Sequence, residues 1–275
     1  MQAASSAKSV DWNQVWREMR TSSVSPARQP KFWDGRAPSF AKHVARTDYA
    51  RVFLEIMEPQ PDWSVLDMGC GAGTLALPLA ERVRSITAVD FSEKMISILR
   101  EQCMKKGINN IRTVCARWED DWQKVGIGLH DVAIASRSLV VEDLQGTIKK
   151  LVSAVRKRVY IVTIVGDGPH DRNAYNAIGR ELKVGPDYIY NYNLLYQMGI
   201  YAKVDFICQN IQDTYDSREE AVESVRWMFR DLTPEEEDKF SKYMERHLIC
   251  REEQWMLDYA RYVRWAVLWW DVEKS

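Results

Sequence analysis

The sequence predicts an α/β protein with a Rossmann-like, mostly parallel sheet and helices on both faces. First, short apolar runs rich in β-branched residues alternate with helical segments from Ser64 to about Gln209, a pattern typical of βαβ units. Second, the first run leads directly into a glycine-spaced turn at 69–73 and then a helix, as in nucleotide-binding sheets. Third, 275 residues of which 46% are hydrophobic can bury one large core.

Each strand is expected where a short apolar run ends at a polar or glycine-rich turn. The helix after the first strand supports this assignment, because Leu75, Leu79 and Val83 lie on one of its faces. The expected strands are Ser64–Asp67, Ser85–Asp90, Ile111–Cys115, Asp131–Ala135, Val159–Val165, Ala202–Gln209 and Tyr262–Trp270.

The segments outside these strands are expected to be mainly helical. Residues 1–60 form an N-terminal helical extension, and residues 61–275 form the main domain, with cap segments at about 166–192 and 215–252. The first cap segment begins as a long Tyr-rich loop, a kind of loop that is often functional. The helices expected in these regions are Val10–Arg20, Phe32–Glu58, Asn193–Met198, Ser217–Phe229 and Pro234–Ile249.

Composition and charge narrow the class of protein. A net charge of -1 is unusual for a nucleic-acid or membrane-surface protein, so neither partner is expected. The five cysteines include no C-x-x-C pair, which favours reduced thiols in the cytoplasm, and no spacing resembles a metal site. The N-terminus lacks an apolar signal segment, and the apolar run Trp265–Trp270 is too short to span a bilayer. Oligomeric state cannot be read from the sequence.

The segment from Val65 to Thr74 carries the main chemical signal. Its glycines allow a sharp turn and let a ligand approach the main chain. Asp67 precedes this turn and Asp90 ends the next strand, so both carboxylates are expected at the same edge of the sheet. Asp90 can accept hydrogen bonds from two ribose hydroxyls, and Asp67 can favour a cationic group. An acid at this point disfavours a dinucleotide, whose pyrophosphate needs a free helix N-terminus.

The pattern Asp67-x-Gly69-x-Gly71-x-Gly73, together with Asp90, resembles motif I and the acidic strand end of class I S-adenosylmethionine (SAM)-dependent methyltransferases, in particular small-molecule members of the type 11-like group. The resemblance implies a seven-stranded sheet whose last strand is antiparallel. It also implies that SAM is the cofactor, that S-adenosyl-L-homocysteine is the product, and that the helices between 217 and 249 are inserted before the last strand.

The resemblance also suggests a cofactor-binding set around these two acids. One position departs from the family, which often has Gly-Asp after the third strand, where this chain has Arg117. A guanidinium cannot accept a hydrogen bond from the adenine amino group, so either Glu119 replaces the acid or the backbone and the Trp118 ring hold the adenine. The expected cofactor-binding residues are Trp33, Asp67, Gly69, Cys70, Gly71, Gly73, Thr74, Asp90, Phe91, Met95, Arg117, Trp118, Glu119 and Ser136.

Two residues are candidates for a direct part in the reaction. Arg137 follows the fourth strand and is able to pair with a carboxylate of the cofactor or of the acceptor, although pairing with Asp167 or Glu142 is an equal alternative. His170 follows the fifth strand and is the histidine to test as a general base. His130 precedes its strand, so it is expected at the opposite edge.

The leading hypothesis is a methyltransferase that moves a methyl group from SAM to a small-molecule acceptor by in-line displacement. Proximity and orientation supply most of the rate in such a reaction, so a catalytic triad is not required. One alternative is an RNA or protein methyltransferase, with the basic residues Lys149, Lys150 and 156–158 as the binding patch. Others are a SAM-binding protein without catalysis and, more distantly, an NAD-dependent oxidoreductase.

Overall fold

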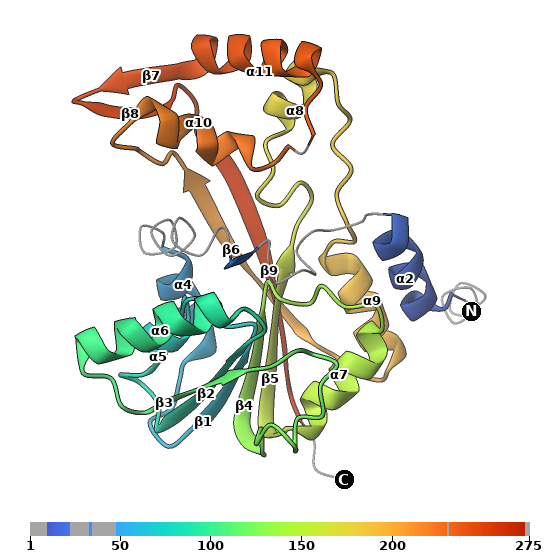
Figure 1. Cartoon of the computed structure of the whole chain (residues 1–275). Helices are drawn as coiled ribbons and strands as arrows, with labels where there is room; N and C mark the ends of the chain where they lie inside the picture. The colour runs from blue at the N-terminus through green and yellow to red at the C-terminus, as the bar shows by residue number, and fades with distance from the viewer. Residues whose placement is uncertain (1–9, 23–32, 35–47, 230, 273–275) are drawn as a thin grey trace. The chain divides into compact units, whose positions relative to one another are not determined.

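A computed structural model describes residues 10–22, 33–34, 48–229 and 231–272 of the chain. Its main feature is a seven-stranded sheet with the strand order β3-β2-β1-β4-β5-β9-β6 (Figure 1). The order reverses between β1 and β4, which is the point where doubly wound sheets bind ligands. The strands of this sheet are β1 (Ser64–Met68), β2 (Ser85–Asp90), β3 (Ile111–Cys115), β4 (His130–Ser136), β5 (Val155–Ile164), β6 (Lys203–Ile211) and β9 (Arg261–Asp271).

Strand directions confirm the predicted Rossmann-like fold. Strand β1 pairs in parallel with β2 and β4, β2 with β3, and β4 with β5. Strand β9 runs the other way along β5, because Val272 donates to the carbonyl of Lys157 while Val165 donates to that of Arg264. The reversed last strand is therefore confirmed, as are all seven predicted strands, although β5 begins at Val155 rather than at Val159.

Helices cover both faces of the sheet. Figure 1 shows α4, α5 and α6 on one side of the strands and α2, α7 and α9 on the other. Buried residues of α2, α7 and α9, such as Trp16, Ile148 and Leu194, belong to the same apolar core as the strands. The helices are α2 (Trp12–Ser22), α4 (Tyr49–Met57), α5 (Ala76–Leu79), α6 (Glu93–Lys106), α7 (Leu144–Ser153), α8 (Arg172–Ile178), α9 (Tyr188–Gln197), α10 (Arg218–Arg226) and α11 (Pro234–His247).

The chain divides into two compact units. The first contains residues 1–163, 185–207 and 266–275, and the second contains residues 164–184 and 208–265. The second unit includes α8, α10, α11 and a hairpin of β7 (Leu248–Arg251) and β8 (Gln254–Leu257). It has its own apolar cluster, in which Phe240 and Met244 of α11 are buried with Val225 of α10. The helices inserted before the last strand are thus present as the resemblance implied.

Two local expectations were wrong, and a third lies mostly outside the described residues. The Tyr-rich stretch is not a loop up to Tyr192, because helix α9 already begins at Tyr188, where the Asp187 side chain accepts from the Ile189 N–H. Helix α11 ends at His247, and the next residues form the unpredicted β7–β8 hairpin. The Phe32–Glu58 helix is described only at 33–34 and at α4, and the remainder, including His43, lies outside the described residues.

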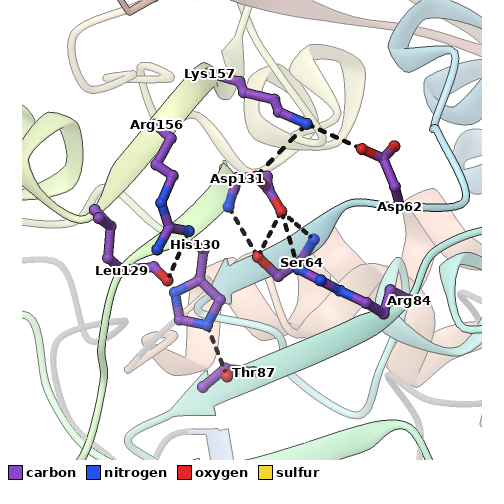
Figure 2. A network of polar contacts seen from close by, with 9 residues as sticks. All are labelled: Asp62, Ser64, Arg84, Thr87, Leu129, His130, Asp131, Arg156 and Lys157. Atoms are coloured by element: carbon purple, nitrogen blue, oxygen red, sulfur yellow. Dashed lines mark hydrogen bonds and ion pairs between the residues drawn. The ribbon is translucent and has the colours of Figure 1, made fainter. Parts of the chain in front are cut away.

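A polar network joins the N-terminal ends of three strands (Figure 2). Its centre is Asp131 of β4, whose Oδ2 atom accepts from the backbone N–H and the hydroxyl of Ser64, both at 2.8 Å. Lys157 of β5 lies 3.6 Å from the other carboxylate oxygen of Asp131 and 3.2 Å from Asp62. Arg84 approaches Asp131 at 3.4 Å. The network therefore joins β1, β4 and β5 where a parallel sheet has open polar groups.

His130 belongs to the same end of the sheet. Its Nε2 atom is 2.8 Å from the Thr87 hydroxyl of β2, and its Nδ1 atom is 2.8 Å from the Gly128 carbonyl. Burial lowers the pKa of His130, which keeps the ring neutral at pH 7. His130 is therefore a satisfied structural side chain at the edge of the sheet opposite to the glycine turn.

Replacing Asp131 with Ala is expected to lower the free energy of unfolding by about 1–3 kcal/mol, because the buried Ser64 groups lose their acceptor. Burial by itself would raise the pKa of Asp131, but the Ser64 hydrogen bonds and the charges of Lys157 and Arg84 lower it overall. The stabilisation is therefore complete at neutral pH and is lost as the pH falls below the ordinary Asp value.

Urea denaturation at neutral and acid pH measures this effect. The control is Asp62→Ala, whose side chain is 72% exposed and pairs with Lys157, so it should cost at most about 1 kcal/mol. Equal losses for the two variants would contradict a central role for Asp131.

Candidate active site

The glycine turn after β1 is held against β2 by its backbone. The N–H groups of Gly69 and Cys70 both donate to the carbonyl of Val89, at 2.7 and 2.9 Å. Gly69 has a φ of +81°, and a Cβ atom built there would lie 2.2 Å from the Cβ of Ser138. Only glycine fits this position, because both the backbone conformation and the close approach of the β4 loop exclude a side chain.

The rest of the turn leads into the apolar helix α5. Gly73 has a φ of +93°, and a Cβ atom there would lie 2.5 Å from Leu99 of α6. Gly71 has a φ of +55°, and its N–H donates to the Asp90 carboxylate at 2.9 Å. Cys70 is buried, and burial raises the pKa of its thiol well above the ordinary value. This thiol is therefore neutral and contributes packing rather than nucleophilic chemistry.

Asp90 links the end of β2 to the turn. One carboxylate oxygen accepts from Gly71 N–H, and the other accepts from Ser92 N–H at 2.9 Å. Burial raises the pKa of Asp90, while these two N–H groups oppose the rise by stabilising the charged form. A carboxylate offers about four acceptor positions, so two remain for a ligand after these bonds. This is the acceptor capacity that a sugar diol requires.

Asp67 is the second acid of the turn and lies at the end of β1. Its side chain is 1% exposed, and among the described residues its Oδ2 atom has no hydrogen-bond partner. Burial, together with the negative charge of Asp90, raises the pKa of Asp67 to about 7. A buried carboxylate oxygen without a donor is costly, so this position suits a ligand that brings a positive charge or a donor.

Trp33 and α6 form one flank of the site. The Trp33 ring packs against Ala72 of the turn and Met95 of α6. The Ser92 hydroxyl donates to Asp34 at 2.5 Å and accepts from Met95 N–H at 3.1 Å. The structure therefore brings the predicted Trp33 and Met95 together beside the turn. Asp34, which was not among the predicted residues, is joined to the Asp90 loop through Ser92.

The end of β3 forms the other flank. Arg117 is exposed, and its guanidinium lies 5.8 Å from the centre of the Phe91 ring. The backbone N–H of Arg117 donates to the Asp120 carboxylate at 2.8 Å. Trp118 is half-buried, and its indole N–H donates to the Ser138 carbonyl at 3.1 Å. Glu119 is exposed. Arg117 therefore lies over Phe91, and Trp118 is tied to the β4 loop.

Residues at the C-terminal end of β4 form a cluster that includes one unpredicted side chain. Ser136 lies with its hydroxyl 2.6 Å from the hydroxyl of Tyr49, which is buried at the start of α4. The guanidinium of Arg137 lies 4.2 Å above the Tyr49 ring. Arg137 has a φ of +57°, which is uncommon for a residue with a side chain and is often found at functional sites. Tyr49 carries no motif, and only the fold brings it to Ser136.

His170 is the candidate for proton transfer that the sequence analysis named. His170 belongs to the second unit, where its ring packs against Tyr175 and Trp227. Burial, followed by the charge of Arg261, lowers the pKa of His170, so its ring is neutral at pH 7. Asp167, one alternative partner of Arg137, forms an ion pair with Arg172.

Known proteins place the chain in a family. A sequence profile described as "Methyltransferase domain" matches residues 65–158, which include the turn, both acids and β4. The chain belongs to the class I SAM-dependent methyltransferases. An uncharacterized protein of Haemophilus influenzae is 33% identical over 248 residues, covering 89% of this methyltransferase and 90% of that protein.

Other relatives share the fold or part of the sequence. A provisionally assigned methyltransferase from Bacillus halodurans C-125 has a crystal structure that matches with a TM-score of 0.55 at 11% identity, covering 83% of this chain and 100% of that chain. The 23S rRNA (uracil(1939)-C(5))-methyltransferase RlmD of Stenotrophomonas maltophilia is 33% identical over 78 residues, which span 26% of this chain and 18% of that enzyme. The Bacillus halodurans structure shows a shared fold, whereas the methyltransferase profile shows that the chain is a SAM-dependent methyltransferase; the acceptor is not determined.

The residues of the turn fit the cofactor that this family uses. The Oδ2 atom of Asp67, which has no donor in the part of the chain that the structure describes, suits a cationic ammonium, and the two remaining acceptor positions of Asp90 suit a ribose diol. Across the described part of the chain, no cluster of three His, Cys, Asp or Glu side chains could hold a metal ion. Within the same residues, every helix is too short or too polar to cross a bilayer.

Proposed function

We propose that the chain binds SAM at the C-terminal edge of β1 and β2 and transfers its methyl group to a small-molecule acceptor. The observation that carries this proposal is the pair of buried acids beside the glycine turn. One is bonded to the turn, and the other has a carboxylate oxygen that lacks a donor among the described residues. SAM supplies a methyl group on a positively charged sulfur. The protein's contribution is orientation of the two reactants and exclusion of water, which accounts for much of the rate in such reactions.

Each predicted cofactor-binding residue except Arg117 has a stated part in this proposal. Asp90 binds the ribose hydroxyls, Asp67 pairs with the α-ammonium, and the backbone of Gly69 and Gly71 lines the turn. The aromatic ring of Trp33 covers the methionine end, and Ser136 is at the edge from which the methyl group is transferred.

The adenine is held by Phe91, Met95 and the Trp118–Glu119 segment, since Arg117 cannot accept from the amino group. Cys70, Gly73 and Thr74 complete the turn.

Cofactor affinity is expected to depend on pH through Asp67. With a pKa of about 7, this carboxyl is mostly protonated near pH 6 and mostly ionised near pH 8. A cationic ammonium prefers the ionised form, so affinity for S-adenosylhomocysteine should rise with pH by up to about tenfold across this window. Isothermal titration at several pH values measures this slope. In Asp67→Asn the slope should vanish, and an unchanged slope in that variant would rule out Asp67 as its source.

Paired charges favour a small acceptor over RNA. The Lys150 ammonium donates to the carbonyls of Trp118 and Asp120, and Arg156 donates to the Leu129 carbonyl. Two further cations of this cluster form ion pairs, Lys157 with Asp62 and Arg158 with Asp271. These groups are engaged within the protein, whereas an RNA-binding surface uses exposed lysines and arginines to contact phosphates.

Arg137 is proposed to bind a carboxylate near the methyl group, because its guanidinium is held over Tyr49 at the end of β4. Two ligands can tell whether Arg137 binds the carboxylate of the cofactor or that of the acceptor. S-adenosylhomocysteine carries the amino-acid carboxylate and 5′-methylthioadenosine lacks it. If Arg137 binds the cofactor, Arg137→Met should weaken only the former ligand, by about tenfold or more. If Arg137→Met binds each ligand as tightly as the wild type does, Arg137 instead binds the acceptor or has a structural role.

His170 is the proposed base when the acceptor arrives protonated, since its pKa is lowered and its Nδ1 atom has no partner among the described residues. Once an acceptor is known, His170→Gln should lower kcat with little change in cofactor affinity. Unchanged kcat across the pH range would remove His170 from the reaction.

Product release with defined acceptor pools tests the function as a whole. Purified protein is incubated with SAM and either a pool of small metabolites or total RNA, and S-adenosylhomocysteine is measured by mass spectrometry. The proposal predicts release with small molecules and none with RNA, and Asp90→Ala should lower the release when SAM is below saturation. Release only with RNA, at a rate that falls steeply with salt, would instead identify an RNA methyltransferase.

A further inference from the structure

The second unit contains an open depression, and none of its lining residues is among the proposed cofactor-binding residues. Its volume is about 560 Å³, within the range of small-molecule sites. It lies between α8 and α11 beside the segment that leads into β9. Every lining residue belongs to the second unit, so the depression is complete within that unit. The lining residues are Asn173, Asn176, Ala177, Tyr243, Arg246, His247 and Tyr259.

A partly buried hydrogen-bonded relay adjoins this depression. Asp171 is 4% exposed; one of its carboxylate oxygens caps α8, and the other accepts from the Tyr259 hydroxyl at 2.5 Å. The hydroxyls of Tyr243 and Tyr259 are in contact. Burial raises the pKa of Tyr243 to about 12, and burial together with the Asp171 bond raises the pKa of Tyr259, so both are protonated at neutral pH.

The direction of the relay follows from the carboxylate. Because an ionised carboxylate can only accept, Tyr259 donates to Asp171 and therefore accepts from Tyr243. Both hydroxyl protons are committed within the protein. The Tyr243 oxygen consequently offers a lone pair, which suits a ligand with a hydroxyl or amino donor.

Two cationic or potentially cationic side chains line the same depression. His247 is fixed by Asp258, whose carboxylate lies 3.0 Å from Nδ1, and its ring lies 4.7 Å from that of Tyr243. The bond at Nδ1 leaves Nε2 as the atom available to a ligand. Arg246 is exposed, and no described residue forms an ion pair with it. Arg246 therefore favours an anionic group, and His247 donates to the same group from Nε2 when its ring is protonated.

We propose that this depression binds a small polyhydroxylated anion, with its carboxylate or phosphate at Arg246 and His247. The side-chain amides of Asn173 and Asn176, which donate and accept, recognise its hydroxyl groups, and Tyr243 accepts from one of them. A neutral sugar leaves Arg246 without a partner, and inorganic phosphate leaves the amides and Tyr243 unused. Both parts of the ligand are thus required.

Imidazole NMR on the full chain tests this site, because the chain has only four histidines and His247→Asn assigns the relevant signal. The probes are gluconate and glucose 6-phosphate, which separate the carboxylate and phosphate sources, with glucose and inorganic phosphate as single-feature controls. The proposal predicts a saturable shift of the His247 signal at millimolar concentrations of at least one of the two polyhydroxylated anions. Each single-feature control should bind at least about tenfold more weakly.

Matched arginine variants complete the test. Arg246→Gln should weaken the probe by about tenfold or more, while Arg251→Gln, a change at an exposed arginine of β7 outside the lining, should not. Affinity for S-adenosylhomocysteine should be unchanged in both variants, which keeps this result separate from the proposed function. The site is overturned if neither anion shifts His247, if inorganic phosphate binds as tightly, or if Arg246→Gln binds like Arg251→Gln.

Discussion

Replacing Gly69 with Ala is expected to abolish measurable cofactor binding and to lower the free energy of unfolding by about 2–5 kcal/mol. About 1–2 kcal/mol arises from placing a side chain at a φ of +81°, and about 1–3 kcal/mol arises from overpacking against Ser138, whose Cβ would be only 2.2 Å away. The turn can relieve that contact only by moving away from the β4 loop. Because Gly69 also donates to Val89, such a move breaks the bond that holds the turn to β2.

A matched glycine separates the two contributions. Gly199 has a φ of +79° with nothing within 4 Å of an added Cβ, so Gly199→Ala should show the backbone strain alone and leave cofactor binding intact. Ser138→Gly removes the atom that clashes, and it should recover part of the stability lost in Gly69→Ala. Urea denaturation of the single and double variants measures both terms. Equal losses at Gly69 and Gly199 would show that the close contact has no energetic role.

Replacing Asp90 with Ala is expected to weaken binding of S-adenosylhomocysteine by about 1–3 kcal/mol, or about 5–150-fold. The change removes the proposed acceptor of the ribose hydroxyls, and it also leaves the N–H groups of Gly71 and Ser92 without their partner. Asp90→Asn keeps one oxygen and should be intermediate. Isothermal titration measures affinity, and circular dichroism verifies folding.

The control for this variant is a neighbouring exposed acid. Glu93 begins α6 three residues later, its side chain is 64% exposed, and it pairs with Arg100. Glu93→Ala should therefore change cofactor affinity little. An Asp90→Ala protein that is folded and binds as well as Glu93→Ala does would contradict the assignment of Asp90 to the ribose.

The sheet could be predicted from the sequence because its strands are short, apolar and followed by sharp turns. The runs at Ser64, Ser85 and Ile111 were found with nearly their observed bounds. The β7–β8 hairpin was missed because its four-residue strands carry little alternation, and its turn at Glu252 and Glu253 uses positive φ without glycine. Helix α9 was missed at its start because Tyr and Asn are weak helix formers, while the cap at Asp187 is a single residue.

The site could be predicted only where a local motif carries it. The spacing of Asp67, Gly69 and Asp90 indicates a strand, a turn and the end of a second strand, and this pattern can be recognised in the sequence itself. Tyr49 precedes Ser136 by 87 residues, and their hydroxyls meet only through packing of α4 beside β4. The relay of Asp171, Tyr243 and Tyr259 likewise joins separate segments of the chain, so the spacing of these residues in the sequence does not predict it.

Titration of the wild-type protein with S-adenosylhomocysteine at about pH 8, beside a parallel titration with NAD⁺, tests the central claim most directly. The two acids at the turn suit a cationic amino-acid end and a ribose and disfavour a pyrophosphate. We expect one molecule of S-adenosylhomocysteine to bind per chain at micromolar concentrations and NAD⁺ to give no saturable heat. A folded protein that does not bind S-adenosylhomocysteine at high micromolar concentration, or that binds NAD⁺ in its place, would contradict the account.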